Sequence, residues 1–390
     1  MSGVSQEREG GVRAAQETPA RPQGNHARRM SSSLAAAAVA ALVLGVGIGV
    51  WLRQHPSARS SPAPLPPRDA LGATASGTGA QPSKPASQAA PQRRLRVEVV
   101  ASAAWGNGPS NLGRTLPREA NPEGPKSFAV DAEGRVSVLD AVHQRILVLQ
   151  HGNVVARVPL PTGSFEDIEM LPDGGYALLD RLGQKAVVFL DTQGRMGAKV
   201  PLLGRGVTEA GGVGALLVRG DGTWVKASEP GARTPKLVRI ADAKGRPDPE
   251  RPIMDGWPLA DGSGVMQTTW EHPSTVVVAV RRQGTPAAWQ RSRIAFPAEI
   301  SHFDASPSDP PGHIFVVATL LRKASPGKAG HEETDMLVVL GPDGAEVGRV
   351  SLPSRKGPYE NFRAIRSGPG GALYHMSWDD TGVTIRRIVL

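Results

Sequence analysis

The sequence predicts an all-β fold, a six-bladed β-propeller closed by an N-terminal strand. Three observations predict it: a unit of about 40 residues that recurs through residues 127–390, tight Asp-Gly or Gly-Gly turns inside the units, and one strand-like segment upstream of them. The clearest copies are residues 128–140, with sequence FAVDAEGRVSVLD, and residues 168–180, with sequence IEMLPDGGYALLD. Short strands joined by such turns in a repeat of this length are typical of propeller blades.

The repeated units follow one another along the chain. Each has a turn followed by a short apolar or alternating run, which predicts an inner strand. The turns are Glu133-Gly134, Asp173-Gly174, Asp221-Gly222, Asp261-Gly262 and Gly370-Gly371, with Pro310 to Gly312 taking the turn place in the fifth unit. The units start near Ser127, Ser164, Gly211, Arg251, Glu299 and Tyr359. The fifth unit also carries a polar insertion, residues 322–334, which we expect to be a mobile loop suited to partner specificity.

The last unit is short, with room for three strands rather than four. Upstream of the first unit, residues 95–100 have the sequence LRVEVV, which alternates as an unpaired strand does. A ring closes well when its N-terminal strand completes the final blade, because both terminal edges are then paired. We therefore expect residues 95–100 to complete the last blade.

An apolar segment lies ahead of the propeller. Residues 31–52 contain no charged side chain. As a helix they would reach roughly 33 Å, which is enough to cross a hydrocarbon layer of ~30 Å. A cleaved signal peptide is the alternative, but no clean small-x-small site follows the apolar run. Because the chain has no Cys, anchoring through an acylated cysteine is excluded. We expect an uncleaved transmembrane anchor helix.

The remaining segments complete the predicted organisation. Residues 1–30 are predicted to be a disordered N-terminal tail, and residues 53–93, rich in Pro, Ala and Ser, a flexible linker ahead of the propeller in residues 94–390. The arginines flanking the anchor are balanced, so the positive-inside rule does not decide its orientation. A short tail before a lone anchor favours export of the large C-terminal part. The bias toward Ala, Gly, Pro and Arg indicates a bacterium, so we expect a single-pass inner-membrane protein with its propeller in the periplasm.

The net charge of +9 is distributed unevenly. Residues 1–93 carry 10 basic and 4 acidic side chains, whereas residues 94–390 carry 35 and 32. A nucleic-acid-binding protein concentrates basic charge on its folded domain and adds aromatic side chains that stack on bases. The basic excess here lies beside the predicted anchor instead, where anionic lipid headgroups can meet it. We expect no nucleic-acid partner.

The first unit carries a resemblance to a known family. Its pattern is Gly124-Pro125, Val130-Asp131, Gly134, Val136, Val138-Leu139-Asp140 and Arg145-Ile146-Leu147. This pattern resembles an NHL repeat, and the second unit resembles it more loosely. Since NHL-type propellers are mostly recognition modules, the resemblance implies that the flat faces of the ring bind a protein, a polysaccharide or another ligand.

A second resemblance points to an enzyme. Glu123-Gly124-Pro125 is similar to the opening of the gluconolactonase and regucalcin-like six-bladed hydrolases. In that family the Glu is a metal ligand at the mouth of the central channel, joined by an Asn and an Asp from later blades. The resemblance implies that Glu123 binds Ca²⁺ or another divalent cation. The sequence departs from the family at Lys126, where an aromatic residue is expected, and shows no later Asn and Asp at matching positions.

Residues just before the innermost strands are expected to surround the channel mouth. Those proposed to bind a ligand there are Glu123, Glu166, Asp167, His302, Asp304, Glu360 and Asn361. Several carboxylates and a histidine that converge on one pore could bind a cation or hold a general base with a raised pKa. The alternative is that these side chains cap turns and accept hydrogen bonds from exposed backbone amides.

No motif for a catalytic nucleophile or a required cofactor accompanies these residues. The chain has no Cys, no Ser in a G-x-S-x-G elbow and no histidines at metal-ligand spacing. The sequence therefore predicts a membrane-anchored extracytoplasmic module that recognises an unknown protein or glycan partner in the cell envelope without catalysis. The alternative is a divalent-metal-dependent lactonase or esterase-like hydrolase with its site at the mouth of the channel.

Overall fold

A computed structural model describes residues 95–229, 234–259, 261–284, 289–307, 312–323, 331–353 and 355–390. The chain divides into two units, Met1–Ser83 and Lys84–Leu390, and every described residue belongs to the second. The expected tail, anchor and linker, residues 1–30, 31–52 and 53–93, lie outside the described residues, so they stay predictions. Within the described part, the structure contains no helix whose length and apolar character would allow it to cross a membrane.

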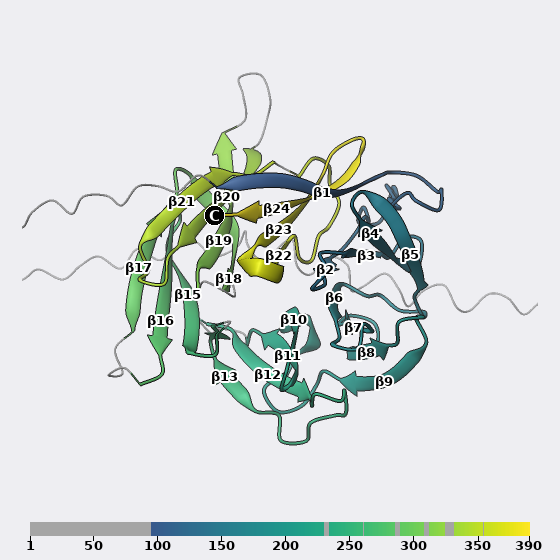
Figure 1. Cartoon of the computed structure of the whole chain (residues 1–390), viewed down its shortest axis with the longest axis horizontal. Coiled ribbons are helices and arrows are strands. Elements are labelled where there is room, and N and C mark those ends of the chain that lie inside the picture. Colours follow the sequence, from purple (N-terminus) through teal and green to yellow (C-terminus); the bar gives the residue numbers. More distant parts are fainter. Residues whose placement is uncertain are drawn as a thin grey trace, which may run out of the picture. The chain divides into compact units, whose positions relative to one another are not determined.

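Six four-stranded antiparallel sheets form the fold and are arranged around a common centre (Figure 1). Blade 1 contains β2 (Phe128–Val130), β3 (Val136–Asp140), β4 (Arg145–Gln150) and β5 (Asn153–Pro159); blade 2 contains β6 (Asp167–Met170), β7 (Tyr176–Asp180), β8 (Ala186–Leu190) and β9 (Met196–Pro201). Blade 3 contains β10 (Val213–Arg219), β11 (Gly222–Ala227), β12 (Lys236–Ala241) and β13 (Ile253–Asp255); blade 4 contains β14 (Trp257–Pro258), β15 (Gly264–His272), β16 (Thr275–Arg282) and β17 (Gln290–Ala295). Blade 5 contains β18 (Glu299–Pro307), β19 (Ile314–Lys323), β20 (His331–Leu340) and β21 (Glu346–Ser351), and blade 6 contains β22 (Ile365–Ser367), β23 (Leu373–Trp378), β24 (Gly382–Val389) and β1 (Arg96–Ala104).

The chain closes its ring by pairing its two ends. β1 runs antiparallel to β24, from Arg96 opposite Val389 to Ala104 opposite Gly382, and is the outermost strand of blade 6. The predicted six-bladed propeller and its closure by the N-terminal strand are therefore confirmed. The fourth unit, predicted to start near Arg251, starts instead at Trp257, because residues 253–255 pair with β12 as the outer strand of blade 3.

Apolar side chains pack between neighbouring blades. Leu139 and Ile146 of blade 1, for example, form one buried cluster with Ile168 and Leu178 of blade 2. The central strands β3, β7 and β8 are buried along their whole length, whereas the outer strand β9 is mostly exposed. Because sheet faces pack on both sides, the blades hold one another in place and leave the polar loops at the two ends of the ring.

The Asp-Gly turns connect strands within blades as the sequence predicts. In blade 2 the Asp173 carboxylate accepts the Gly175 N–H at 3.0 Å, and Gly174 has φ +84°. Glycine adopts this backbone conformation without steric cost. At Gly175 a Cβ would lie 2.4 Å from the Leu190 carbonyl oxygen, so the chain passes β8 at a distance that only glycine permits.

The polar insertion in blade 5 is shorter than predicted. β19 runs to Lys323 and β20 starts at His331, with Arg322 opposite Glu332 in the register. Residues 324–330 lie outside the described residues. Residues 322–323 and 331–334, which were expected to belong to a loop over residues 322–334, instead extend β19 and β20, because the two strands continue to pair there.

Candidate functional site

A network of charged side chains ties the innermost strands together. Arg366 on β22 donates to the Phe128 carbonyl from Nε at 2.7 Å and to Ser127 Oγ from Nη2 at 3.0 Å. The same guanidinium contacts the carboxylates of Asp167 and Glu169 on β6. Arg366 and Asp167 are almost fully buried, with side-chain exposures of 3% and 0%. The last blade is thereby joined to blades 1 and 2 through the centre of the ring.

Arg363 extends this network to blade 3. Its Nη1 donates to the Leu216 carbonyl at 2.7 Å and to Glu169 Oε1 at 3.1 Å. Asp167 Oδ2 accepts the Leu216 N–H at 2.9 Å. Buried charges are tolerated when they are paired, and each arginine of this network contacts both carboxylates. Burial raises the pKa of Glu169, and the charges of Arg366 and Arg363 only partly offset it.

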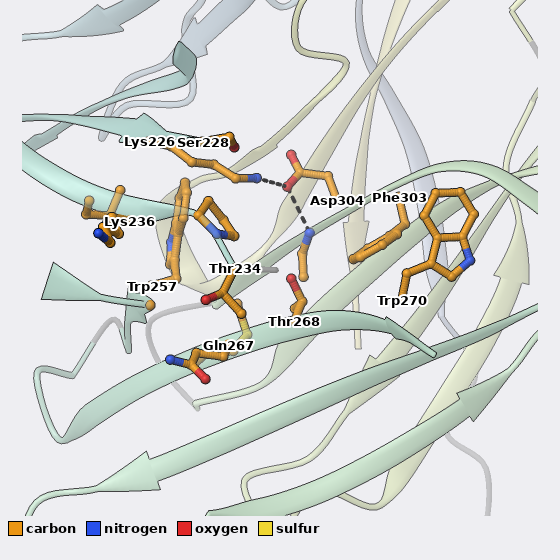
Figure 2. A pocket seen from close by; sticks show the side chains of 15 residues that line it. Lys226, Ser228, Thr234, Lys236, Trp257, Gln267, Thr268, Trp270, Phe303 and Asp304 are labelled. Atoms are coloured by element: carbon orange, nitrogen blue, oxygen red, sulfur yellow. Dashed lines mark hydrogen bonds and ion pairs between the residues drawn. The ribbon is translucent and has the colours of Figure 1, made fainter. Parts of the chain in front are cut away.

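A cavity of about 290 Å³ opens between blades 3, 4 and 5 (Figure 2). We call it the aromatic pocket, and its walls include Lys226, Lys236, Trp257, Gln267, Thr268, Trp270, Phe303 and Asp304. Trp270 meets the Phe303 ring edge-on, with centroids 5.8 Å apart, and remains 46% exposed. Aromatic rings with open faces can bury a flat apolar surface of a ligand.

An ion pair lies against the aromatic rings. Lys226 Nζ is 3.5 Å from Asp304 Oδ1 and 5.6 Å from the centre of the Trp257 ring. Figure 2 shows the Lys226 amine and the Asp304 carboxylate pointing toward each other, with the Phe303 ring on the far side of Asp304. Since Gln267 and Thr268 supply further polar groups, the pocket combines apolar area with a few directional contacts.

A second cavity, of about 230 Å³, lies between blades 5 and 6. We call it the polar pocket, and its walls include His302, Asp304, Asp335, Arg355, Asn361, Arg363 and His375. Asp304 lines both pockets. Burial opposes the charge of Asp304, but Lys226 and Arg363 outweigh it, so the pKa of this carboxyl lies below its ordinary value. His302 is exposed at the rim, but partial desolvation by the surrounding cavity wall lowers the pKa of its ring, which favours the neutral form at neutral pH.

Asp335 forms one wall of the polar pocket. Its Oδ1 accepts hydrogen bonds from Thr319 Oγ1 at 2.7 Å and Arg355 Nη2 at 3.2 Å, and its Oδ2 lies 3.3 Å from His375 Nε2. Burial alone would raise the pKa of Asp335, but the His375 hydrogen bond and the Arg355 charge outweigh it and lower this pKa. Asp335 is therefore ionised at neutral pH.

We expect Asp335→Asn to reduce the free energy of unfolding at neutral pH by about 1–3 kcal/mol, because donors are left facing a neutral amide. A folded-state pKa below the ordinary 3.8 means that the carboxylate contributes fully above that pH and loses its contribution as pH falls through the folded value. The stability of the wild type should thus fall more steeply below pH ~4 than that of Asp335→Asn, measured by urea unfolding. If the stabilities of the wild type and of Asp335→Asn fell equally steeply below pH ~4, the lowered pKa of Asp335 would be contradicted. Asp343→Asn, at an exposed turn of the same blade, is the control.

The structure brings three of the sequence-predicted residues into one cavity. His302, Asp304 and Asn361 all line the polar pocket. Asn361 also donates to the Pro125 carbonyl at 3.4 Å, which places it at the contact between blades 6 and 1. Ligand binding by these side chains stays a prediction, and the polar pocket is the cavity in which a ligand would contact all three.

The other four predicted residues have separate surroundings. Glu166 pairs with Arg181 at 2.9 Å, and Asp167 belongs to the central network. Glu360 accepts from Asn121 at 2.7 Å and pairs with Lys126 at 3.3 Å. Glu123 is exposed, and its backbone forms a bridge with Thr115. Three of the four thus support neighbouring loops or strands.

The described residues contain no cluster of His, Cys, Asp and Glu side chains for the metal that the second resemblance implies. Across the described ranges, no three His, Cys, Asp or Glu side chains lie close enough together to hold a metal ion. Glu123 therefore has no group of acidic or imidazole partners in this part of the chain, and its metal role stays a prediction without geometric support.

Sequence inspection missed the most prominent side chains of both pockets. They are Lys226, Trp257, Trp270, Phe303, Asp335, Arg355 and Arg363. Trp257 and Trp270 are two of only seven tryptophans in the chain and fall in one blade, which is a weak signal because tryptophan also serves packing between blades. Arg366 lines neither pocket, but its place on the innermost strand β22 explains why its buried charge needs the partners of the central network.

Comparisons with known proteins show no family for this chain. No family model and no curated protein matches the sequence. The gluconolactonase XC5397 from Xanthomonas campestris is similar in structure, with 16% identity over 78% of this chain and 92% of that one, at a TM-score of 0.40. The PQQ-bound aldose sugar dehydrogenase from Streptomyces coelicolor is also similar, with 13% identity over 77% of this chain and 100% of that one, at a TM-score of 0.42. Virginiamycin B lyase from Staphylococcus aureus has 10% identity over 76% of this chain and 99% of that one, at a TM-score of 0.36. The class that the sheets define is the six-bladed β-propeller.

Proposed function

We propose that this propeller is a recognition module that binds its partner through the aromatic pocket and performs no catalysis. The observation that carries the proposal is the grouping of Trp257, Trp270 and Phe303 around the Lys226–Asp304 ion pair in one cavity. Aromatic residues with a polar neighbour supply large contact area and orientation together, and they are enriched where proteins bind partners. The exposure of Trp270 means that this area is open to a ligand.

The partner is a protein or a glycan of the cell envelope. Either class presents flat apolar surface edged by hydrogen-bonding groups, which matches the rings, amide and hydroxyl groups of the pocket. We place the propeller in the periplasm of a bacterium, held at the inner membrane by residues 31–52 and spaced from it by residues 53–93. Alkaline extraction of membranes tests this placement, since a membrane-spanning anchor stays in the membrane fraction.

We expect Trp270→Ala to weaken partner binding at least about tenfold, because it removes the exposed ring from the pocket. The full chain, kept in mild detergent, would be titrated with soluble envelope glycans and peptides while tryptophan fluorescence is recorded. The matched control is Trp289→Ala, which removes a tryptophan of the same blade that contacts Arg281 outside the pocket. A bound glycan or peptide whose affinity is the same in both variants would place recognition elsewhere and refute the proposal.

A further inference from the structure

The polar pocket contains a buried donor that no described residue satisfies. Arg363 is 8% exposed and lines the cavity, and its Nη1 is used by Glu169 and the Leu216 carbonyl. Its Nε, in contrast, has no hydrogen-bond partner among the described residues. Buried N–H groups are nearly always hydrogen-bonded, so an unpaired one beside a cavity marks a place for an acceptor from outside the protein.

The same cavity holds a carboxylate with an unused oxygen. Asp304 Oδ1 accepts the Ala305 N–H at 2.9 Å and faces Lys226, while no described residue donates a hydrogen bond to Oδ2. Arg363 and Asp304 attract each other electrostatically, yet no ion pair joins them in the described part of the chain. A positive and a negative group thus face one cavity without touching.

Inside its exposed rim, the cavity wall carries two arginines and two aspartates. Arg355 and Arg363 oppose Asp304 and Asp335, and His302 adds no charge while its ring is neutral. Arg355 is 23% exposed, and its Nη2 donates to Thr319 and Asp335. Its guanidinium carbon lies 5.9 Å from the centre of the Trp378 ring, and no described residue accepts a hydrogen bond from its Nε or Nη1. A lone anion would meet Asp304 and a lone cation would meet the two arginines. Glu333 lies at the exposed rim, where water and salt screen its charge.

We propose that the polar pocket is a second binding site and takes a small zwitterion, an α-amino acid. Its carboxylate accepts hydrogen bonds from Arg363 Nε and the free side of Arg355, and its ammonium donates to Asp304 Oδ2. An α-amino acid carries these two charges on groups bonded to the same carbon, so one small molecule can meet an arginine and a carboxylate that face one cavity of about 230 Å³. Neutral His302 and Asn361 add polar contacts that need no charge on the ligand. This site is separate from the partner site proposed for the aromatic pocket.

Titration calorimetry on the full chain in mild detergent tests the inference. The probes are the common α-amino acids, followed by the N-acetyl and the amide derivative of whichever amino acid binds most tightly. We expect the free amino acid to bind and to raise the melting temperature, and each derivative to bind at least about tenfold more weakly because it lacks one charge. Arg355→Met and Asp304→Asn should each weaken binding by a similar factor.

The controls are Arg195→Met and Asp191→Asn, which remove the members of an exposed ion pair on blade 2. Absence of binding by every amino acid would overturn the inference, and so would equal binding of the N-acetyl derivative, which would indicate a simple anion site. Unchanged affinity in folded Asp304→Asn would also overturn it, even if Arg355→Met failed to fold. Arg355 does not line the aromatic pocket, so its variant separates this inference from the proposed function.

Discussion

Replacing Arg366 with methionine is expected to lower the free energy of unfolding by about 3–5 kcal/mol. Methionine fills much of the volume but leaves the buried Asp167 carboxylate and the partly buried Glu169 carboxylate without a main counter-charge. It also leaves the Phe128 carbonyl without its donor at 2.7 Å. Removing one partner of a buried ion pair costs far more than the pair contributes, because the remaining charge stays desolvated.

Urea unfolding followed by tryptophan fluorescence measures this effect, with Arg195→Met as the matched control. Arg195 also pairs with a carboxylate, but its side chain is 76% exposed, so its loss should change stability by less than about 1 kcal/mol. A loss within 1 kcal/mol for Arg366→Met would mean that the central network contributes little and that packing between blades alone holds the ring.

The fold could be predicted from the sequence because its signals are local. Asp-Gly turns, strands with alternating side chains and one complete repeat can each be recognised within a stretch of a few tens of residues. Closure followed from a physical requirement, since a short last unit and a lone strand upstream leave two edges that pair best with each other. The boundary of blade 4 could not be placed, because residues 253–255 differ from an innermost strand only in the sheet that they join.

The candidate site could be predicted only in part. His302, Asp304 and Asn361 were expected just before the innermost strands, and all three line one cavity. His302 and Asp304 lie within the innermost strand β18 and not before it. The partners of these residues could not be found in this way, because they come from distant blades. Asp167 and Arg366, for example, are 199 residues apart in sequence. No local pattern distinguishes a carboxylate that meets such a partner from one that faces an open cavity.

The two pockets differ in the kind of prediction that they support. The aromatic pocket is lined by three aromatic rings, of which Trp270 is 46% exposed, so the proposed ligand is constrained by shape and less by charge. The polar pocket is lined by charges of both signs, so its ligand is constrained by the position of its own charges. Asp304 lines both pockets, so the effect of Asp304→Asn alone does not say which pocket is involved. It must be compared with Trp270→Ala, which changes only the aromatic pocket, or with Arg355→Met, which changes only the polar pocket.

Placing a charge on the inner face of the N-terminal strand is the second substitution with a large expected effect. Ala101 on β1 is 1% exposed and packs in the cluster that joins blades 6 and 1. Ala101→Asp should lower the free energy of unfolding by about 3–5 kcal/mol, because the carboxylate is buried without a partner. Thermal and urea unfolding of the full chain measure it.

The neighbouring position supplies the control, because side chains of a strand alternate between its two faces. Ser102 follows Ala101 on β1, is exposed and lies opposite Thr384 of β24. Ser102→Asp should therefore change stability by no more than about 0.5 kcal/mol. If Ala101→Asp were as mild as this control, the inner face of β1 would not be packed against the ring. The closure of blade 6 would then rest on β22, β23 and β24 alone, with β24 as an open edge.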